Sequence, residues 1–215
     1  MAEPVRSDAL EMRQISKHFG GQLAVNGVDL VVQAGEVHGL IGQNGAGKST
    51  VVNILAGRLK PNEGEVRHDD RVLVSPTHVE KHLETLVAVV HQEGSVLPAL
   101  TIGENLVLGE DRAAPSTVSR RAMRSRVAGA YEALGLPVPD ASALCSKLPP
   151  ADRKILEIVR AFSSGVRFVL LDEPSASLDP RMTDWLIGAM HEAARVRSLG
   201  IIFVSHRLRE VQRGT

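Results

Sequence analysis

The stretch from Gly42 to Thr50, GQNGAGKST, combines glycines, a lysine and hydroxyl side chains at a spacing that suits phosphate binding. Glycines let the main chain curl so that successive N–H groups point into one hollow, which attracts anions. A helix that begins at about Lys48 would direct the positive end of its dipole there. We therefore expect Lys48 to contact the outer phosphates of a nucleotide and the Ser49 hydroxyl to bind Mg²⁺.

The residues on either side of this loop support that interpretation. Val37 to Ile41 reads as a short buried strand, and Val51 to Gly57 reads as a helix with an apolar face. Strand, loop and helix in this order are the setting that the pattern requires. A turn that merely joins two elements needs no lysine and hydroxyls at its exit, so we favour a phosphate site.

Two adjacent carboxylates, Asp172 and Glu173, directly follow the apolar strand predicted at 167–171. In a chain with a phosphate loop, Asp172 would hold the Mg²⁺ shell. Glu173 would accept a proton from the attacking water or orient it. A solvated acidic turn is the alternative, and the apolar run before the pair disfavours it.

Polar side chains also end two other predicted strands. Gln92 closely follows the apolar run 86–90, and His206 closely follows the run 200–204. Ligands of open α/β sheets bind at the carboxyl ends of the strands, so Gln92 could touch the metal or the water and His206 the terminal phosphate. Taken alone, each would more often be an ordinary structural residue.

Phe19 is the one aromatic residue close upstream of the loop, after a strand predicted at 10–15 and before another at 28–32. It could stack on an adenine ring, or it could equally be a core phenylalanine.

The remaining segments are predicted as follows. Residues 65–67 and 71–74 form short antiparallel strands. Thr101 caps a helix with Glu104 three residues on, and Asp179 precedes Pro180 at a helix start.

A helix at 119–134 carries a basic cluster, for which a solvated face is favoured over a partner or phospholipid surface; it contains Arg120, Arg121, Arg124 and Arg126. A further helix spans 151–162, and its buried face is expected to contain Ile155, Ile158, Val159 and Phe162.

Composition limits the class of protein. The chain has 215 residues with 43% hydrophobic content, which is enough for one large α/β domain. A formal net charge of zero argues weakly against a nucleic-acid partner. The single cysteine, Cys145, excludes a disulfide within the chain and suits a reducing compartment. Neither a secretory signal nor an apolar run long enough to span a bilayer is evident, so a membrane role would need a partner.

Together these motifs resemble the nucleotide-binding subunit of ATP-binding cassette (ABC) transporters over almost the whole chain. GQNGAGKST matches the phosphate loop of the family, VLLDEP its Asp-Glu motif, and SASLD, ending at Asp179, its inter-subunit aspartate loop. VHGLIGQNGAGKST, VVHQE, LTIGENLVLG and FVSHRLREV look most like the branch that powers import of simple sugars.

The resemblance implies a P-loop NTPase fold of the ABC ATPase type, with a mainly parallel sheet, a small antiparallel β region and a helical insert at about 94–162. It implies an ATPase with Glu173 as catalytic base, Lys48 on the phosphates and His206 as the switch that senses the γ-phosphate. Mg²⁺ would be held by Ser49, Gln92 and Asp172. The nucleotide would contact Phe19, Gly42, Gln43, Asn44, Gly45, Ala46, Gly47, Lys48, Ser49, Thr50 and Gln92.

The chain departs from the family at its signature, normally Leu-Ser-Gly-Gly-Gln, which falls on 148–152. Pro149 lacks the serine hydroxyl, and Pro150 has no N–H to donate, although its ring suits a first helical turn. Two donors expected to reach the γ-phosphate bound to the other cassette of a dimer are therefore missing. The chain also stops soon after the histidine, so we expect a single domain over 1–215 that is truncated at its C-terminal end.

The expected function is ATP binding and hydrolysis that powers a membrane transporter, with import of a simple sugar as its task. The implied partners are a second cassette and a transmembrane permease, at the cytoplasmic face of the cell membrane, with no nucleic acid. A soluble ABC ATPase acting on ribosomes is one alternative. A poorly hydrolysing regulatory cassette, suggested by Pro149 and Pro150, is the other. A DNA-repair type is disfavoured because 93–146 shows no sustained heptads.

Overall fold

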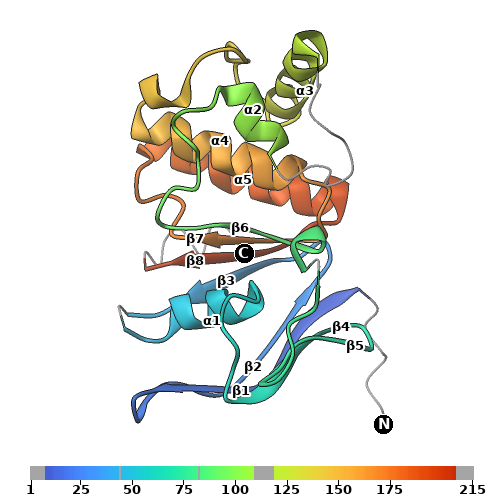
Figure 1. Cartoon of the computed structure of the whole chain (residues 1–215), viewed down its shortest axis with the longest axis vertical. Coiled ribbons are helices and arrows are strands. Elements are labelled where there is room, and N and C mark those ends of the chain that lie inside the picture. The colour runs from blue at the N-terminus through green and yellow to red at the C-terminus, as the bar shows by residue number, and fades with distance from the viewer. Residues whose placement is uncertain (1–7, 44, 82, 109–118, 207–215) are drawn as a thin grey trace.

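The computed structural model describes residues 8–43, 45–81, 83–108 and 119–206. The described chain is layered (Figure 1): helices α2 to α5 lie on one side of a parallel sheet, and helix α1 and an antiparallel sheet lie on the other. Among the described residues, no helix is both long enough and apolar enough to cross a membrane.

The parallel sheet is built from the apolar runs of the sequence. Its strands, in the spatial order β3-β8-β7-β6, are β3 (Val37–Ile41), β8 (Gly200–Ser205), β7 (Phe168–Asp172) and β6 (Val87–Val90). Every residue of β7 and β8 is buried, as expected when both faces of a parallel sheet are covered. Because all four strands run the same way, the residues that follow them meet at one edge.

Alternate residues of β7 serve two different cores. Phe168 and Leu170 pack in the cluster that contains helix α1 and strands of the antiparallel sheet. Val169 and Leu171 pack in the cluster formed with helices α2 to α5. Successive side chains of a strand point to opposite faces, so the parallel sheet separates the two cores.

The antiparallel sheet is larger than the sequence indicated. Its strands, in the order β2-β1-β4-β5, are β2 (Gln22–Gln33), β1 (Ala9–Phe19), β4 (Glu63–His68) and β5 (Arg71–Val74). The predicted pairing of residues around 65–67 and 71–74 is confirmed. Strand β1 continues past Ile15 to Phe19 because it pairs with β2, although its last residues are polar enough to resemble a loop.

Two of the helices, α2 and α5, begin where capping residues were predicted. The helices are α1 (Lys48–Leu55), α2 (Ile102–Val107), α3 (Arg120–Glu132), α4 (Pro150–Ser163) and α5 (Pro180–Arg197), with two 3₁₀ turns at Leu83–Thr85 and Cys145–Lys147. Thr101 and Glu104 form the capping box of α2. The side chain of Asp179 accepts a hydrogen bond from the N–H of Met182 at 2.7 Å and caps α5.

Helix α4 is buried over more of its circumference than its apolar pattern suggested. Ile158, Val159 and Phe162 are buried as predicted, but Ile155 is only partly buried. The buried surface also includes Leu156 and two charged side chains, Lys154 and Glu157. Lys154 interacts with main-chain carbonyls and Glu157 with main-chain amides, in a segment that lies outside the helix.

Candidate functional site

The loop between β3 and α1 is shaped by glycines in the left-handed conformation. Gly45 and Gly47 both have φ of 85°, which residues with a side chain rarely adopt. A Cβ atom placed on Gly47 would collide with the carbonyl oxygen of Ala24 on strand β2. The exit of the loop therefore packs directly against the antiparallel sheet. Asn44 lies outside the described residues.

Lys48, the first residue of α1, points back into the curl of the loop. Its Nζ donates hydrogen bonds to the carbonyl oxygens of Gly42 at 2.6 Å and Gln43 at 3.0 Å. Only 9% of the residue is exposed. The ammonium group is thus held within the loop, next to the main-chain groups that are expected to bind phosphate.

One pocket of about 370 Å³ brings distant parts of the chain together at the carboxyl edge of the parallel sheet. The residues that line it are Ala24, Gly45, Gly47, Lys48, Ser49, Thr50, Gln92 and Glu173. Five of the predicted loop residues thus share a pocket with Gln92 and Glu173, each of which comes from a different strand end. Gly42, Gln43 and Ala46, which were also predicted to contact the nucleotide, are not among the described residues that line it. Ala24 was missed, because nothing in its sequence context distinguishes it from other residues of an exposed strand.

Asp172 is the last residue of β7 and only 8% exposed. Burial, followed by the negative charge of Glu173, raises the pKa of this carboxyl above its ordinary value. The positive charges of Lys48 and Lys154 act in the opposite direction. A carboxylate in this setting would be favoured by a further positive charge at the strand end, as a bound cation would supply.

Glu173 adopts a conformation that is rare for a residue with a side chain, with φ of 47°. Its N–H donates to the carbonyl of Val204 on β8 at 3.0 Å, which fixes the turn that leaves the sheet. Its Oε1 lies 3.3 Å from Nδ1 of His206, the residue that follows β8. Backbone strain of this kind concentrates at functional sites. The structure therefore places the predicted base beside the predicted switch histidine.

Phe19 is not a core residue, because 51% of it is exposed. The Nζ of Lys17 lies 5.4 Å from the centre of its ring. Phe19 is absent from the described lining of the pocket, but its strand β1 pairs with β2, which contributes Ala24. An exposed ring on this strand is compatible with adenine stacking, which stays a prediction.

The signature stretch forms the start of α4, as predicted. Pro149 occupies the N-cap position without a side-chain hydrogen bond, and Pro150 is the first helical residue. The carbonyl of Pro149 accepts a hydrogen bond from the N–H of Arg153 at 3.1 Å. The first turn of the helix is therefore formed, but it lacks the hydroxyl and one of the amides that the family pattern would supply.

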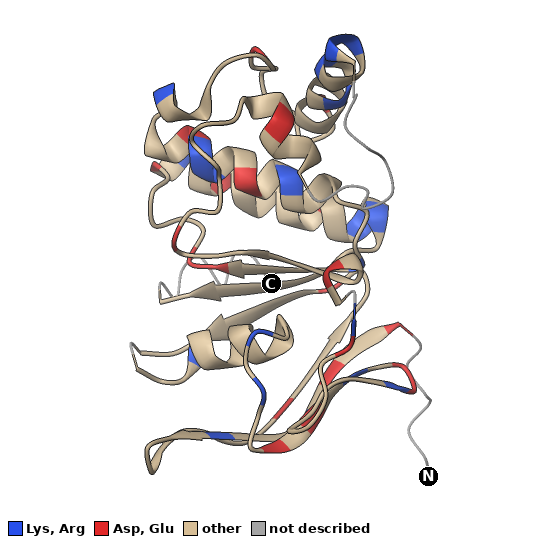
Figure 2. Ribbon diagram, in the orientation of Figure 1, with Lys and Arg blue, Asp and Glu red and all other residues tan. Residues whose placement is uncertain are grey.

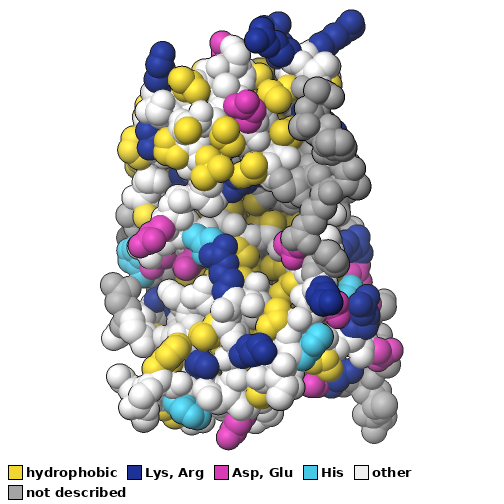
Figure 3. Space-filling view, in the orientation of Figure 1, with side chains coloured by type: hydrophobic (Ala, Val, Ile, Leu, Met, Phe, Trp, Pro, Cys, Tyr) yellow, Lys and Arg dark blue, Asp and Glu magenta, His cyan; other side chains and the backbone are white. Residues whose placement is uncertain are grey.

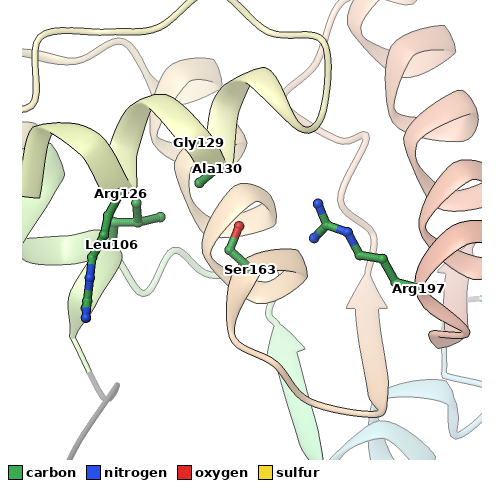
Figure 4. Close-up of a pocket in the computed structure, with 6 residues that line it drawn as sticks. All are labelled: Leu106, Arg126, Gly129, Ala130, Ser163 and Arg197. Carbon is green, nitrogen blue, oxygen red and sulfur yellow. The ribbon is translucent and has the colours of Figure 1, made fainter.

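A second hollow of about 300 Å³ lies away from this edge, among helices α2 to α5 (Figure 4). Arg126, Ser163 and Arg197 line it, and Arg197 Nη1 donates to the carbonyl of Phe162 at 2.9 Å. Basic residues mark much of α3 (Figure 2). The predicted basic cluster is divided between surfaces, since Arg120 and Arg124 line a different hollow beside Glu104.

Comparison with known sequences identifies close relatives of the chain. A family model described as ABC transporter matches residues 25–176. The arabinose import ATP-binding protein AraG of Burkholderia pseudomallei (strain 1710b) is 38% identical over 205 residues, covering 95% of this chain and 40% of that protein. The ribose import ATP-binding protein RbsA of Lactococcus lactis subsp. cremoris (strain SK11) is 35% identical, covering 94% of this chain and 41% of that protein. The chain thus spans about two fifths of the length of these relatives.

Solved structures show the same architecture. The dimeric structure of MJ0796, a bacterial ABC transporter cassette, matches with a TM-score of 0.82 at 22% identity, covering 95% of this chain and 91% of that chain. The ADP conformation of MJ1267, an ATP-binding cassette of an ABC transporter, matches with a TM-score of 0.79 at 25% identity, covering 95% and 83%. The predicted P-loop NTPase fold of the cassette type is therefore confirmed.

Proposed function

Because the chain belongs to the ATP-binding cassette transporter family, whose cassettes are ATPases, we propose that it binds Mg²⁺·ATP and that its hydrolysis powers a membrane transporter. One observation carries this proposal. The phosphate loop, Gln92 and Glu173 line a single pocket, with Asp172 at the adjoining strand end. These residues lie far apart in the sequence, and only the fold brings them together.

The loop and Lys48 would bind the triphosphate. Lys48 Nζ already lies within hydrogen-bonding distance of two loop carbonyls, so a modest change of rotamer would direct it to an outer phosphate. Gly45 and Gly47 bend the main chain at the pocket, and the N-terminus of α1 adds its dipole there.

The side chains around the pocket suit Mg²⁺. Ser49 offers a hydroxyl, Gln92 an amide oxygen and Asp172 a carboxylate, all hard oxygen ligands of the kind that Mg²⁺ prefers. The described part of the chain contains no group of three or more His, Cys, Asp or Glu side chains placed to hold a metal ion. Mg²⁺ is usually held by one or two protein carboxylates together with substrate phosphates and waters. When bound, Mg²⁺ would neutralise charge that develops on the β- and γ-phosphate oxygens.

Glu173 would prepare the attacking water. Its carboxylate lines the pocket and lies beside His206, so it can accept a proton from a water that approaches the γ-phosphate in line with the leaving oxygen. The imidazole of His206, whose Nδ1 lies 3.3 Å from Oε1 of Glu173, would contact the same phosphate. Both side chains start from ends of neighbouring strands, which restricts their relative movement.

We propose further that a second cassette completes the site, in a sandwich that closes on ATP and opens after hydrolysis. The start of α4 would face the γ-phosphate bound by that partner. Pro149 and Pro150 remove two donors from this position, and a donor aimed at developing charge can be worth about 3 kcal/mol. The site that this signature completes would therefore turn over slowly. A partner cassette with an intact signature would complete the other site, where hydrolysis could proceed at the ordinary rate.

The transported solute we propose is a simple sugar, since the relatives are named as arabinose and ribose import ATP-binding proteins. The chain would act through a permease, at the cytoplasmic face of the membrane. The helical subdomain at about 94–162 is the proposed contact region. Hydrophobic side chains gather over the helical layer (Figure 3), and Leu97 and Leu144 are 46% and 40% exposed.

Calorimetric titration with ATP and Mg²⁺ tests the proposal. Lys48→Met should weaken binding about tenfold or more, because a hydrogen bond to a charged group is lost. Lys60→Met removes an exposed lysine that bonds the carbonyl of Thr77, and it should leave the affinity unchanged. Absence of Mg²⁺-dependent heat from folded protein would overturn the nucleotide site.

A poorly hydrolysing regulatory cassette is the second candidate, and the two prolines at the start of α4 favour it. ATP binding without measurable turnover, even beside its partner cassette and permease, would support that role. Turnover coupled to the permease would support the transporter ATPase.

A further inference from the structure

Three charged side chains of α4 contact the short segment 91–96, which directly follows β6 and contains Gln92. Lys154 Nζ donates to the carbonyl of His91 at 2.6 Å and lies 3.4 Å from that of Gln92. Glu157 Oε1 accepts from the N–H of Val96 at 3.1 Å and also from the N–H of Ser95. Arg160 donates to the hydroxyl of Ser95. The contacts made by Lys154 and Glu157 are to main-chain atoms, so they fix the path of the segment regardless of its side chains.

Burial sets this arrangement apart from an ordinary helix-surface ion pair. Lys154 is 7% exposed and Glu157 is 2% exposed, and their Nζ and Oε2 atoms are 2.9 Å apart. Buried charges carry a large desolvation penalty that is offset only when they are paired and hydrogen-bonded. Here each charge has its partner and additionally bonds the segment 91–96, so straightening or shifting that segment would leave buried charged groups unsatisfied.

The contacts join two parts of the site. Gln92 lines the nucleotide pocket, whereas α4 starts at the signature stretch and Pro150.

We infer that Lys154 and Glu157 are positioning residues, whose buried ion pair clamps the main chain of 91–96 and thereby ties the placement of Gln92 in the nucleotide pocket to the helix that begins with the signature. The clamp of 91–96 is a property of the fold, and its consequence for Mg²⁺·ATP rests on the proposed function. Movement of α4 on contact with a second cassette would be transmitted to Gln92 through this clamp.

The test replaces both charges together, in Lys154→Met/Glu157→Leu, so that no lone charge is buried. A matched control is Glu192→Leu/Arg195→Met, which removes an exposed pair of the same i,i+3 spacing on α5. Hydrogen exchange in the full 215-residue chain should show amides at 91–96 exchanging about tenfold faster in the first variant, with little change elsewhere or in the control. Lys154→Met/Glu157→Gln keeps an acceptor oxygen for the N–H groups of Ser95 and Val96 without burying a lone charge, and it should restore much of the protection at those two amides.

The functional arm measures the Mg²⁺ concentration that gives half-maximal ATPase activity in the assembly with the partner cassette. This half-maximal Mg²⁺ concentration should rise several-fold in Lys154→Met/Glu157→Leu, while the affinity for ATP without Mg²⁺ stays unchanged. Unaltered exchange at 91–96, or an equal rise across the whole chain, would overturn the clamp. If the parent protein shows no Mg²⁺-dependent binding of ATP, the proposed function fails, and the exchange result still decides the clamp.

Discussion

Glu173 combines an unfavourable main-chain conformation with the side chain that we expect to act as the base. Glu173→Gln removes the basic oxygen but preserves the size and the main-chain bond to Val204. Turnover of the assembled transporter should fall about a hundredfold to ten-thousandfold, the range associated with a general base, while affinity for Mg²⁺·ATP is retained. Steady-state ATPase assays and calorimetry measure the two quantities.

The control for this substitution is Glu192→Gln, at an exposed carboxylate on α5, which should change neither quantity. Retention of full turnover by Glu173→Gln would contradict the assigned role.

Asp172 should make the nucleotide-free protein less stable as pH rises. Its pKa is raised in the folded chain above an unfolded value of about 4, so the folded state binds the extra proton. Its contribution to the free energy of unfolding is therefore lost as pH increases from the unfolded pKa through the folded pKa. Asp172→Asn should abolish this dependence and, without Mg²⁺, raise the free energy of unfolding at pH 7 by about 1 kcal/mol.

Urea unfolding at a series of pH values, with chelator present, measures the difference between these two proteins. A variant that is less stable than the parent at pH 7 under those conditions would show that Asp172 does not carry the expected desolvation cost.

At the scale of single elements, the start of α4 offers the clearest test. Pro149→Ser would provide the missing cap, which is typically worth about 1 kcal/mol of stability. Combined with Pro150→Gly it would restore both donors of the signature, so ATPase activity of the assembly with a second cassette should increase. Thermal unfolding and phosphate release measure the two effects.

A rise in stability without a rise in activity would show that the prolines are not what limits turnover. A suitable control is Pro98→Ser, because it lies outside the signature while the carbonyl of this proline still accepts a bond from the N–H of Ser146.

Prediction from sequence succeeded where local chemistry determines the element. The glycines before Lys48, the capping box at Thr101 and Asp179 before α5 each act within a few residues, and the corresponding loop and helix starts are confirmed. The extension of β1 to Phe19 was missed because it depends on pairing with β2. The buried pair of Lys154 and Glu157 was missed because charges at i,i+3 on a helix usually indicate a solvated face.

The part of the candidate site that could be predicted consists of residues that directly follow parallel strands. Gln92 and Glu173 line the same pocket as the phosphate loop, because the carboxyl ends of parallel strands share one edge, and their chemical roles stay predictions. Ala24 of β2 also lines the pocket. Its position there depends on how the antiparallel sheet packs against the phosphate loop, and no motif spacing in the sequence predicts that packing.

At the scale of the whole molecule, the parallel sheet makes the two cores depend on each other. Phe168→Ala would open a cavity on the side of α1, and Leu171→Ala would open one on the side of α4 and α5. Both residues are fully buried, so each substitution should cost about 3 to 5 kcal/mol. Because both residues belong to β7, each substitution should lower the midpoint temperature of one shared unfolding transition.

Calorimetry and circular dichroism follow that transition, and the two probes should coincide in both variants. Two separated transitions in either variant would instead mean that the helical layer and the antiparallel layer unfold as independent units. As a control, Val196→Ala changes a side chain that is 59% exposed, and it should leave the midpoint temperature of unfolding unchanged.

The left-handed main chain at Glu173 also limits which amino acids can replace this residue during evolution. Asparagine, aspartate and glycine enter that region at small cost, whereas valine and isoleucine are sterically opposed there. Descendants that abandoned hydrolysis while keeping the fold should therefore more often carry asparagine or glycine at this site. Valine and isoleucine should be rare among them, because a β-branched side chain at this positive φ would destabilise the fold.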